Sequence, residues 1–304
     1  MPRILVSGSL AYDHLYTFPG VFKNGVRAFN VKDKAVHFGG CAGNIAFSAK
    51  LLHEDVVMLG IAGRDFSDYE KWLRANKIST DSVIIDESVY TSQATVATDQ
   101  KGRQIILFHE GAAALSPKYT SKIRATILKH KNQLRLAIVA PNNRNFMLTS
   151  IKTCLESKIP YIFDPGQAMP LFSKSELRDL AQKSAGMMLN EYELELYKKL
   201  AQISLKEIIQ NVPLLVITLG EKGSEIYFEE KVVRIPAIKS KSVKDPTGCG
   251  DAYRAGFIVG IQNDMKNLNI KILQKAAALG TKLAAACLQK VGTQNHTASL
   301  SLRT

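Results

Sequence analysis

One short segment, Asp245-Pro246-Thr247-Gly248-Cys249-Gly250-Asp251, combines residue types that bind an anion with a carboxylate that could remove a proton. Gly248 and Gly250 permit a tight backbone in which several N–H groups point the same way, and a helix beginning here would aim its positive end at the same point. Asp251 would stand beside the anion, which suits a base for an attacking hydroxyl. The segment predicts phosphoryl transfer, although an ordinary turn and helix cap would use the same residues.

A second glycine-rich segment lies far upstream, at residues 39–44. Gly39 and Gly40 leave open space, and the Asn44 amide can both donate and accept hydrogen bonds. Asp13 adds a carboxylate, so that the set suits the adjacent hydroxyls of a sugar. The alternative is that Asn44 starts a helix and Asp13 lies in a turn.

Two further polar segments lie between these glycine-rich ones. Asn190 and Glu193 would share one face of a first helical turn, where Glu193 could position a hydrated Mg²⁺ beside phosphates. The alternative is a capping box formed by the same pair. Thr218 and Gly220 end an apolar strand, which is where ligands gather in open α/β sheets. Gly223 would let a nucleotide approach the backbone, or would serve a hairpin turn.

Short apolar runs alternate with helical patterns along most of the chain. Strands are expected at residues 3–7, 56–60, 134–139, 159–163, 186–189 and 214–218. Helices are expected at residues 43–52, 116–130, 144–157, 174–183, 191–201 and 271–290. This rhythm predicts an α/β fold with a largely parallel, helix-covered sheet.

One region interrupts the rhythm. Residues 92–99 and 103–109 are typical of a hairpin, and residues 11–38 also alternate in a strand-like way. We expect a small β lid, from about 11–38 and 88–111, over the mouth of a substrate site, or else an edge extension without that role. With neither linker nor internal repeat in the sequence, 1–304 is expected to be a single domain carrying this lid.

Composition narrows the class of protein. The hydrophobic content of 46% is ample for a substantial core. Forty Lys and Arg against 27 Asp and Glu give a net charge of +13, but the basic residues are dispersed, which favours a solvated surface and no nucleic-acid partner. The sequence contains neither a signal peptide nor an apolar run of membrane-spanning length, so we expect a cytoplasmic protein without a membrane partner.

Four cysteines are scattered without the spacing of a zinc site. They are Cys41, Cys154, Cys249 and Cys287. Reduced thiols are expected, and those within the glycine-rich segments are expected to be compact space-fillers, with Cys249 open to oxidation.

The polar segments together resemble the ribokinase-like, or PfkB-type, kinases, in order and in separation. Residues 245–251 resemble the C-terminal signature of that family, and residues 39–44 match its upstream glycine segment. Residues 190–193 match its Asn-x-x-Glu element, and residues 218–223 resemble its nucleotide-binding turn. The sequence has no Walker loop, which disfavours an ordinary P-loop kinase. The resemblance covers most of the chain and implies a three-layer α/β/α fold.

The resemblance also implies a role for each of these residues. Asp251 would be the catalytic base, beside an anion hole built from the backbone amides of Gly248, Cys249 and Gly250. Substrate contacts are implied for Asp13, Gly39, Gly40 and Asn44. ATP contacts are implied for Asn190, Thr218, Gly220, Gly223, Thr247 and Asn295. Glu193 would hold Mg²⁺ through water, and Asp245 belongs to a region that shapes a monovalent-cation site, so K⁺ is a further expected cofactor.

Within this family the chain looks most like bacterial and archaeal adenosine-kinase-like members. The resembling stretches are residues 104–112, 163–167 and 292–296. The expected acceptor is the 5′-hydroxyl of a ribonucleoside, adenosine preferred, and the alternatives are ribose or a related sugar, or a nucleoside-binding regulator without catalysis. Arg103 stands where Asn is usual and Glu110 where Pro is common. A monomer or homodimer is expected.

Overall fold

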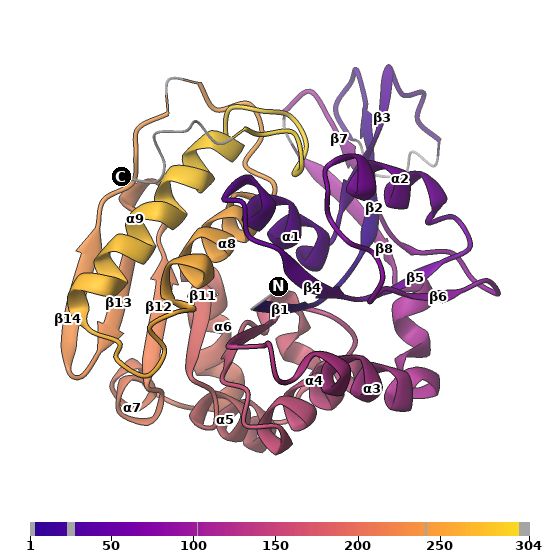
Figure 1. Ribbon diagram of the computed structural model, residues 1–304. Coiled ribbons are helices and arrows are strands. Elements are labelled where there is room, and N and C mark those ends of the chain that lie inside the picture. Colours follow the sequence, from indigo (N-terminus) through magenta and orange to yellow (C-terminus); the bar gives the residue numbers. More distant parts are fainter. Residues whose placement is uncertain (1–3, 23–27, 102, 241, 298–304) are drawn as a thin grey trace.

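The structure is a computed structural model that describes residues 4–22, 28–101, 103–240 and 242–297. Parts of the predicted elements lie outside these residues, namely residue 3, residues 23–27 of the lid segment and Gly102 of the hairpin, and so do residues 298–304 at the C-terminus. Two sheets organise the described chain, an eight-stranded one and a four-stranded one (Figure 1).

The large sheet has the strand order β14-β13-β12-β11-β10-β9-β1-β4. Its strands are β1 (Ile4–Ser7), β4 (Val56–Leu59), β9 (Leu136–Val139), β10 (Tyr161–Phe163), β11 (Gly186–Asn190), β12 (Leu214–Thr218), β13 (Ser224–Phe228) and β14 (Lys231–Ile235). Neighbours from β4 to β12 pair in parallel, and β13 and β14 add an antiparallel hairpin at the edge. The carboxyl ends of the parallel strands therefore share one side of the molecule.

Helices cover both faces of this sheet, as Figure 1 shows. One face packs α1 (Cys41–Leu51), α2 (Ser67–Ala75), α8 (Cys249–Ile261) and α9 (Ile270–Cys287). The other packs α3 (Thr120–His130), α4 (Arg144–Glu156), α5 (Lys174–Gln182), α6 (Glu191–Ala201) and α7 (Leu205–Asn211). Successive residues of β1 alternate between the two cores, with Val6 in the first and Leu5 in the second. The predicted three-layer α/β/α fold is confirmed.

The four-stranded sheet has the order β3-β2-β7-β8. Its strands are β2 (Ala11–Thr17), β3 (Asp33–Gly39), β7 (Ser92–Thr98) and β8 (Gln104–His109). The predicted hairpin is present as the antiparallel pair β7 and β8, and β2 joins it by pairing in parallel with β7. The segments expected to form the lid therefore build one sheet, seen beside the main body in Figure 1.

Some elements differ from the sequence expectation. The helix expected at 116–130 is divided, because Pro117 lies in a 3₁₀ segment, η1 (Gly111–Tyr119), and α3 begins only at Thr120. The short parallel pair β5 (Ile61–Gly63) and β6 (Ile84–Asp86), together with α2, α7 and the β13–β14 hairpin, had not been predicted.

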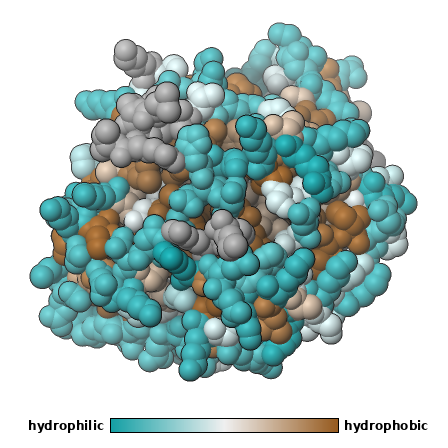
Figure 2. Space-filling model, viewed as in Figure 1, coloured by the Kyte–Doolittle hydropathy of each residue, from teal (hydrophilic) through white to brown (hydrophobic). Residues whose placement is uncertain are grey.

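The surface seen in Figure 2 is mostly hydrophilic, with apolar side chains in separate small areas. Among the described residues, no helix combines the length and the apolar character needed to cross a membrane.

Candidate active site

The glycine-rich turn at residues 245–251 leads directly into α8. Gly248 is the N-cap and has φ +78°, and a Cβ there would lie 2.8 Å from the Cβ of Thr293, so only glycine fits. The Asp245 carboxylate holds the turn, since Oδ1 accepts from Thr247 N and Oδ2 from Gly292 N, each at 2.9 Å. The N-terminal end of α8 therefore lies beside Asp251, and Cys249 N donates to the Pro246 carbonyl at 3.3 Å. An anion site at this turn stays a prediction.

The second glycine segment ends at the start of α1. Gly40 has φ +83°, and a Cβ there would lie 2.5 Å from the Ser9 carbonyl oxygen. Asn44, in the first turn of α1, donates from Nδ2 to Asp251 Oδ2 at 2.8 Å. The two glycine-rich segments thus meet in space, at the carboxyl side of the parallel sheet.

The Asn44 amide is held in one orientation by the C-terminal segment. Its Oδ1 lies 2.7 Å from Thr293 Oγ1 and accepts from Gln294 Nε2 at 3.1 Å. Gln294 is itself fixed by Tyr69 at 2.5 Å and by Trp72, whose indole N–H donates to Gln294 Oε1. With Oδ1 turned to these donors, Nδ2 must face Asp251.

Asp251 is partly buried, and desolvation raises the pKa of its carboxyl group. The charge of Arg254 and the hydrogen bond from Asn44 oppose that rise without cancelling it. A carboxylate whose pKa lies above its ordinary value accepts a proton more readily, which suits a general base.

Asp13 lies on β2, two residues after Ala11, which is the register partner of Gly39 on β3. A Cβ at position 39 would lie 2.4 Å from Asp13 Oδ2, so glycine is needed for the carboxylate to occupy this place. Burial, and then the charges of Asp251 and Asp245, raise the pKa of Asp13 to about 6. Asp13 is a strand residue and not the turn residue of the alternative, and it is electrostatically coupled to Asp251.

Asn190 and Glu193 form a complete capping box at the start of α6. Asn190 Oδ1 accepts from Glu193 N, and Glu193 Oε2 accepts from Asn190 N, both at 2.8 Å. The capping alternative is therefore present in the structure. Glu193 Oε2 also lies 3.3 Å from Arg254 Nη2, so the carboxylate's contacts with the described residues use Oε2 and leave Oε1 without a partner there.

Mg²⁺ fits this arrangement only through water. Within the described part of the chain, no group of three or more His, Cys, Asp or Glu side chains could hold a metal directly. Mg²⁺ keeps most of its water ligands and needs few carboxylates, so the Oε1 atom of Glu193 is a sufficient donor for a hydrated ion.

A buried ion pair involves Arg254, which lies one turn after Asp251 on α8. Arg254 Nε is 2.5 Å from Asp164 Oδ2, and both side chains are less than a tenth exposed. Asp164 and Glu193 raise the pKa of Arg254 although burial lowers it, so the guanidinium stays charged beside Asp251. Arg254 and Asp164 were not singled out as site residues, because their partners come from distant helices and strands.

Several of the residues predicted to contact ATP lie at or just after the ends of β11 and β12. Asn190 and Thr218 are the last residues of β11 and β12, and they are register partners at the carboxyl edge of the sheet. Gly220, with φ +56°, has open space where a Cβ would stand. At position 223 the packing itself requires glycine, because a Cβ there would lie 2.0 Å from the Ile235 carbonyl oxygen.

The C-terminal residues are divided between surface and core. Asn295 is exposed, and its amide donates to the Val291 carbonyl at 2.8 Å. His296 is 1% exposed and lies 3.1 Å from Ser48 Oγ, which makes it a core residue. Thr293 and Gln294 were given no role of their own within the resembling stretch 292–296, yet they are buried and contact Asn44.

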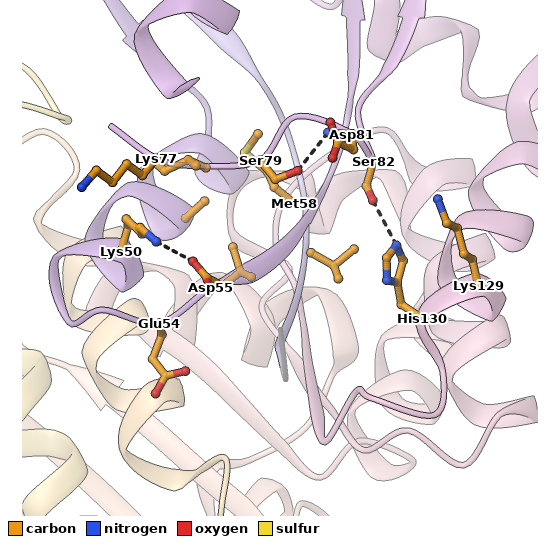
Figure 3. Close-up of a pocket in the computed structure, with 14 residues that line it drawn as sticks. Lys50, Glu54, Asp55, Met58, Lys77, Ser79, Asp81, Ser82, Lys129 and His130 are labelled. Carbon is orange, nitrogen blue, oxygen red and sulfur yellow. Dashed lines mark hydrogen bonds and ion pairs between the residues drawn. The ribbon is translucent and has the colours of Figure 1, made fainter. Parts of the chain in front are cut away.

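A cavity of about 390 Å³ lies elsewhere, between α1, β4 and α3 (Figure 3). Two of the side chains that line it form an ion pair, with Lys50 Nζ 2.5 Å from Asp55 Oδ1, and Ser82 Oγ is 3.5 Å from His130 Nε2. None of the residues assigned to the site above is among those that line it. The chemistry is therefore expected at the meeting of α1 and α8.

The sequence profile of the pfkB family carbohydrate kinases matches residues 1–299. The chain belongs to this family. It is accordingly an ATP-dependent phosphotransferase with a hydroxyl acceptor. The resemblance to ribokinase-like kinases is confirmed.

Solved structures agree with this assignment. The nucleoside kinase of Burkholderia thailandensis in complex with inosine is 32% identical, with a TM-score of 0.85 over 98% of this chain and 95% of that one. Its complex with ADP-inosine is 31% identical, with a TM-score of 0.81 over 98% and 93%.

Two curated relatives differ in the activity named for them. A nucleoside kinase of Methanocaldococcus jannaschii is 28% identical over 97% of this chain and 93% of its own length. A ribokinase of Lactococcus lactis is 27% identical over 99% and 95%.

Proposed function

We propose that this kinase transfers the γ-phosphoryl group of MgATP to the 5′-hydroxyl of a ribonucleoside, with adenosine the preferred acceptor. The observation that carries the proposal is the hydrogen bond between Asn44 and Asp251, because it joins the segment suited to a sugar with the segment suited to a phosphate. Nucleosides are favoured over free sugars because the relatives of Burkholderia and Methanocaldococcus are named nucleoside kinases.

The acceptor would lie where the four-stranded sheet, which carries Asp13 and Gly39, meets the start of α1, which carries Asn44. Asp13 and Asn44 would bind two neighbouring hydroxyls of the ribose, one as an acceptor and the other as a donor. Gly39 and Gly40 leave the backbone bare of side chains there. Because Asp13 and Gly39 belong to the four-stranded sheet, this sheet would act as the lid over the acceptor.

Proton removal falls to Asp251. The carboxylate would take the proton of the 5′-hydroxyl as that oxygen attacks the γ-phosphorus, while the amides of Gly248, Cys249 and Gly250 bind the transferring group. Arg254, held by Asp164, adds a fixed positive charge near the base. The phosphoryl group would pass directly to the hydroxyl oxygen, without a covalent intermediate on the protein, because the site holds the two reactants in position.

ATP would lie along the carboxyl edge of β11 and β12, near Asn190, Thr218 and Gly220, with Gly223, Thr247 and Asn295 as further contacts. When bound, Mg²⁺ supplies charge neutralisation for the phosphates, and Glu193 Oε1 would hold it through water. Hydrogen bonds from Thr247 and Gly292 outweigh the effect of burial and keep the pKa of Asp245 low, which suits a nearby K⁺.

The test is a phosphorylation assay with MgATP and, separately, adenosine, inosine, cytidine and ribose. The product of each reaction is identified by ³¹P NMR, and Asp251→Asn serves as the control for contaminating kinases. Turnover of nucleosides to 5′-monophosphates supports the proposal. Turnover of ribose alone would make the chain a sugar kinase, as its Lactococcus relative is named. Binding without any turnover would favour a nucleoside-binding regulator.

A further inference from the structure

Two of the four cysteines meet beside the proposed phosphate-binding turn. Cys249 is the first residue of α8, and Cys287 is the last residue of α9. Cys249 Sγ lies 4.0 Å from the Asp245 carbonyl oxygen, and Cys287 Sγ lies 3.6 Å from that of Thr247. Each thiol is also close enough to shift the pKa of the other. Residues far apart in sequence thus place two sulfur atoms against one short turn.

The two thiols differ in access. Cys249 is partly exposed, whereas Cys287 is completely buried. Cys249 is the first residue of α8, and a position at a helix N-terminus favours a thiolate. An accessible thiol with thiolate character beside a second, shielded thiol is the arrangement found in redox-active cysteine pairs.

The remaining cysteines lack this arrangement. Burial raises the pKa of Cys41, and it raises the pKa of Cys154 to about 12. Cys154 is fully buried in the core on the other face of the sheet. Cys249 therefore differs from Cys41, which is also partly exposed, in having a second thiol at the same turn.

We propose that Cys249 and Cys287 form a peroxide-sensitive dithiol whose disulfide disables the phosphate-binding turn. The Cys249 sulfur attacks one oxygen of hydrogen peroxide, the O–O bond breaks, and the other oxygen leaves as water, which produces a sulfenic acid. The Cys287 sulfur then displaces the hydroxyl group of that sulfenic acid, which leaves as a second water. Two thiols are oxidised to one disulfide, and one peroxide is reduced to two waters.

The effect on catalysis rests on the proposed function. Gly248, Cys249 and Gly250 provide the amides of the anion hole, and a covalent bond from Cys249 to the end of α9 would pull this turn out of its reduced geometry. We expect the oxidised protein to lose about a hundredfold in turnover, comparable to removing one donor from an anion hole. Reduction with dithiothreitol should restore it.

Peptide mapping tests the site without relying on activity. The full chain is treated with hydrogen peroxide, alkylated and digested without reduction. We expect a cross-linked pair of peptides carrying Cys249 and Cys287, two hydrogens lighter than the sum of the thiol forms and lost on reduction. A map in which Cys249 is sulfinic while Cys287 remains a thiol would overturn the proposal, whatever the protein's activity.

Two variants separate this dithiol from general oxidation. Cys287→Ala should retain the basal activity and should form no reversible disulfide, whereas Cys154→Ala, the matched loss of another buried thiol, should behave as the native chain. If the disulfide forms and turnover is unchanged, the claimed effect on the turn is wrong. If no acceptor is ever phosphorylated, the proposed function fails while the peptide map still decides the site.

Discussion

Asn44 Nδ2 donates a 2.8 Å hydrogen bond to Asp251 Oδ2, although the two residues are 207 positions apart. The bond places the start of α1 against the start of α8, with no packed core between them. Each helix begins at a glycine of positive φ, Gly40 or Gly248. A sugar hydroxyl bound near Asn44 would consequently lie within reach of both Asp251 and the amides of the α8 turn.

Replacing Asp251 by asparagine keeps the shape of the side chain and removes its ability to take a proton. We expect turnover to fall by at least about a hundredfold, the lower range for losing a general base. The Kd for ATP, measured by titration calorimetry, should remain nearly the same. Asp81→Asn, at a carboxylate that is 73% exposed, is the surface control. Near-normal turnover in Asp251→Asn would remove this residue from the role of base.

Asp13→Asn should stabilise the protein at high pH while weakening acceptor binding. The pKa of Asp13 rises from 3.8 to about 6 on folding, so the folded state holds a proton that the unfolded chain releases between these values. Stability is therefore lost as the pH rises through this window, by roughly 3 kcal/mol at most for about two pKa units. The asparagine variant avoids that loss.

Urea unfolding at about pH 4 and about pH 8 measures this difference. The variant should gain mainly at the higher pH, and the KM for the acceptor should rise. Asp33→Asn, at an exposed carboxylate of β3, should have no comparable dependence on pH. An equal gain at both pH values would contradict the assignment of the shift to Asp13.

The parts of the site that the sequence predicts are those encoded locally. The Gly248 turn, the Asp251 carboxylate and the Gly40 segment each carry their chemistry within a few residues, and α8 and α1 begin where these patterns require. Asn190 and Glu193 were open to two interpretations because one short spacing suits both a cap and a metal neighbour. The capping box is present, and the role with Mg²⁺ stays a prediction.

The supporting side chains could not be predicted from local patterns. Gln294 contacts Asn44 across 250 positions, and Arg254 contacts Asp164 across 90. Such pairs follow from how β strands and helices stack, which hydrophobic spacing does not specify. Gly223 is a similar case, because its need for glycine arises from the approach of Ile235 on another strand.

Thr293→Val should affect the acceptor more than ATP. The hydroxyl lies 2.7 Å from Asn44 Oδ1, and its loss leaves Gln294 Nε2 as the remaining donor to that oxygen among the described residues. We expect the KM for the nucleoside to rise by about tenfold, the equivalent of one hydrogen bond, with a smaller change in the KM for ATP. Thr281→Val removes another buried hydroxyl, one bonded within α9, and is the matched control. Equal changes in both KM values would contradict a positioning role.

Arg254→Met should be strongly destabilising, because it leaves the carboxylate of Asp164 buried without its partner. A broken buried ion pair costs about 3–5 kcal/mol, which urea unfolding would measure. Arg234→Met, at an arginine that is 78% exposed and pairs with Glu225, should change stability little. Adding Asp164→Asn to Arg254→Met removes the stranded charge and should recover part of the loss. If the double variant is less stable than Arg254→Met alone, the pair is not coupled as its geometry requires, and the arginine must stabilise the fold through other contacts.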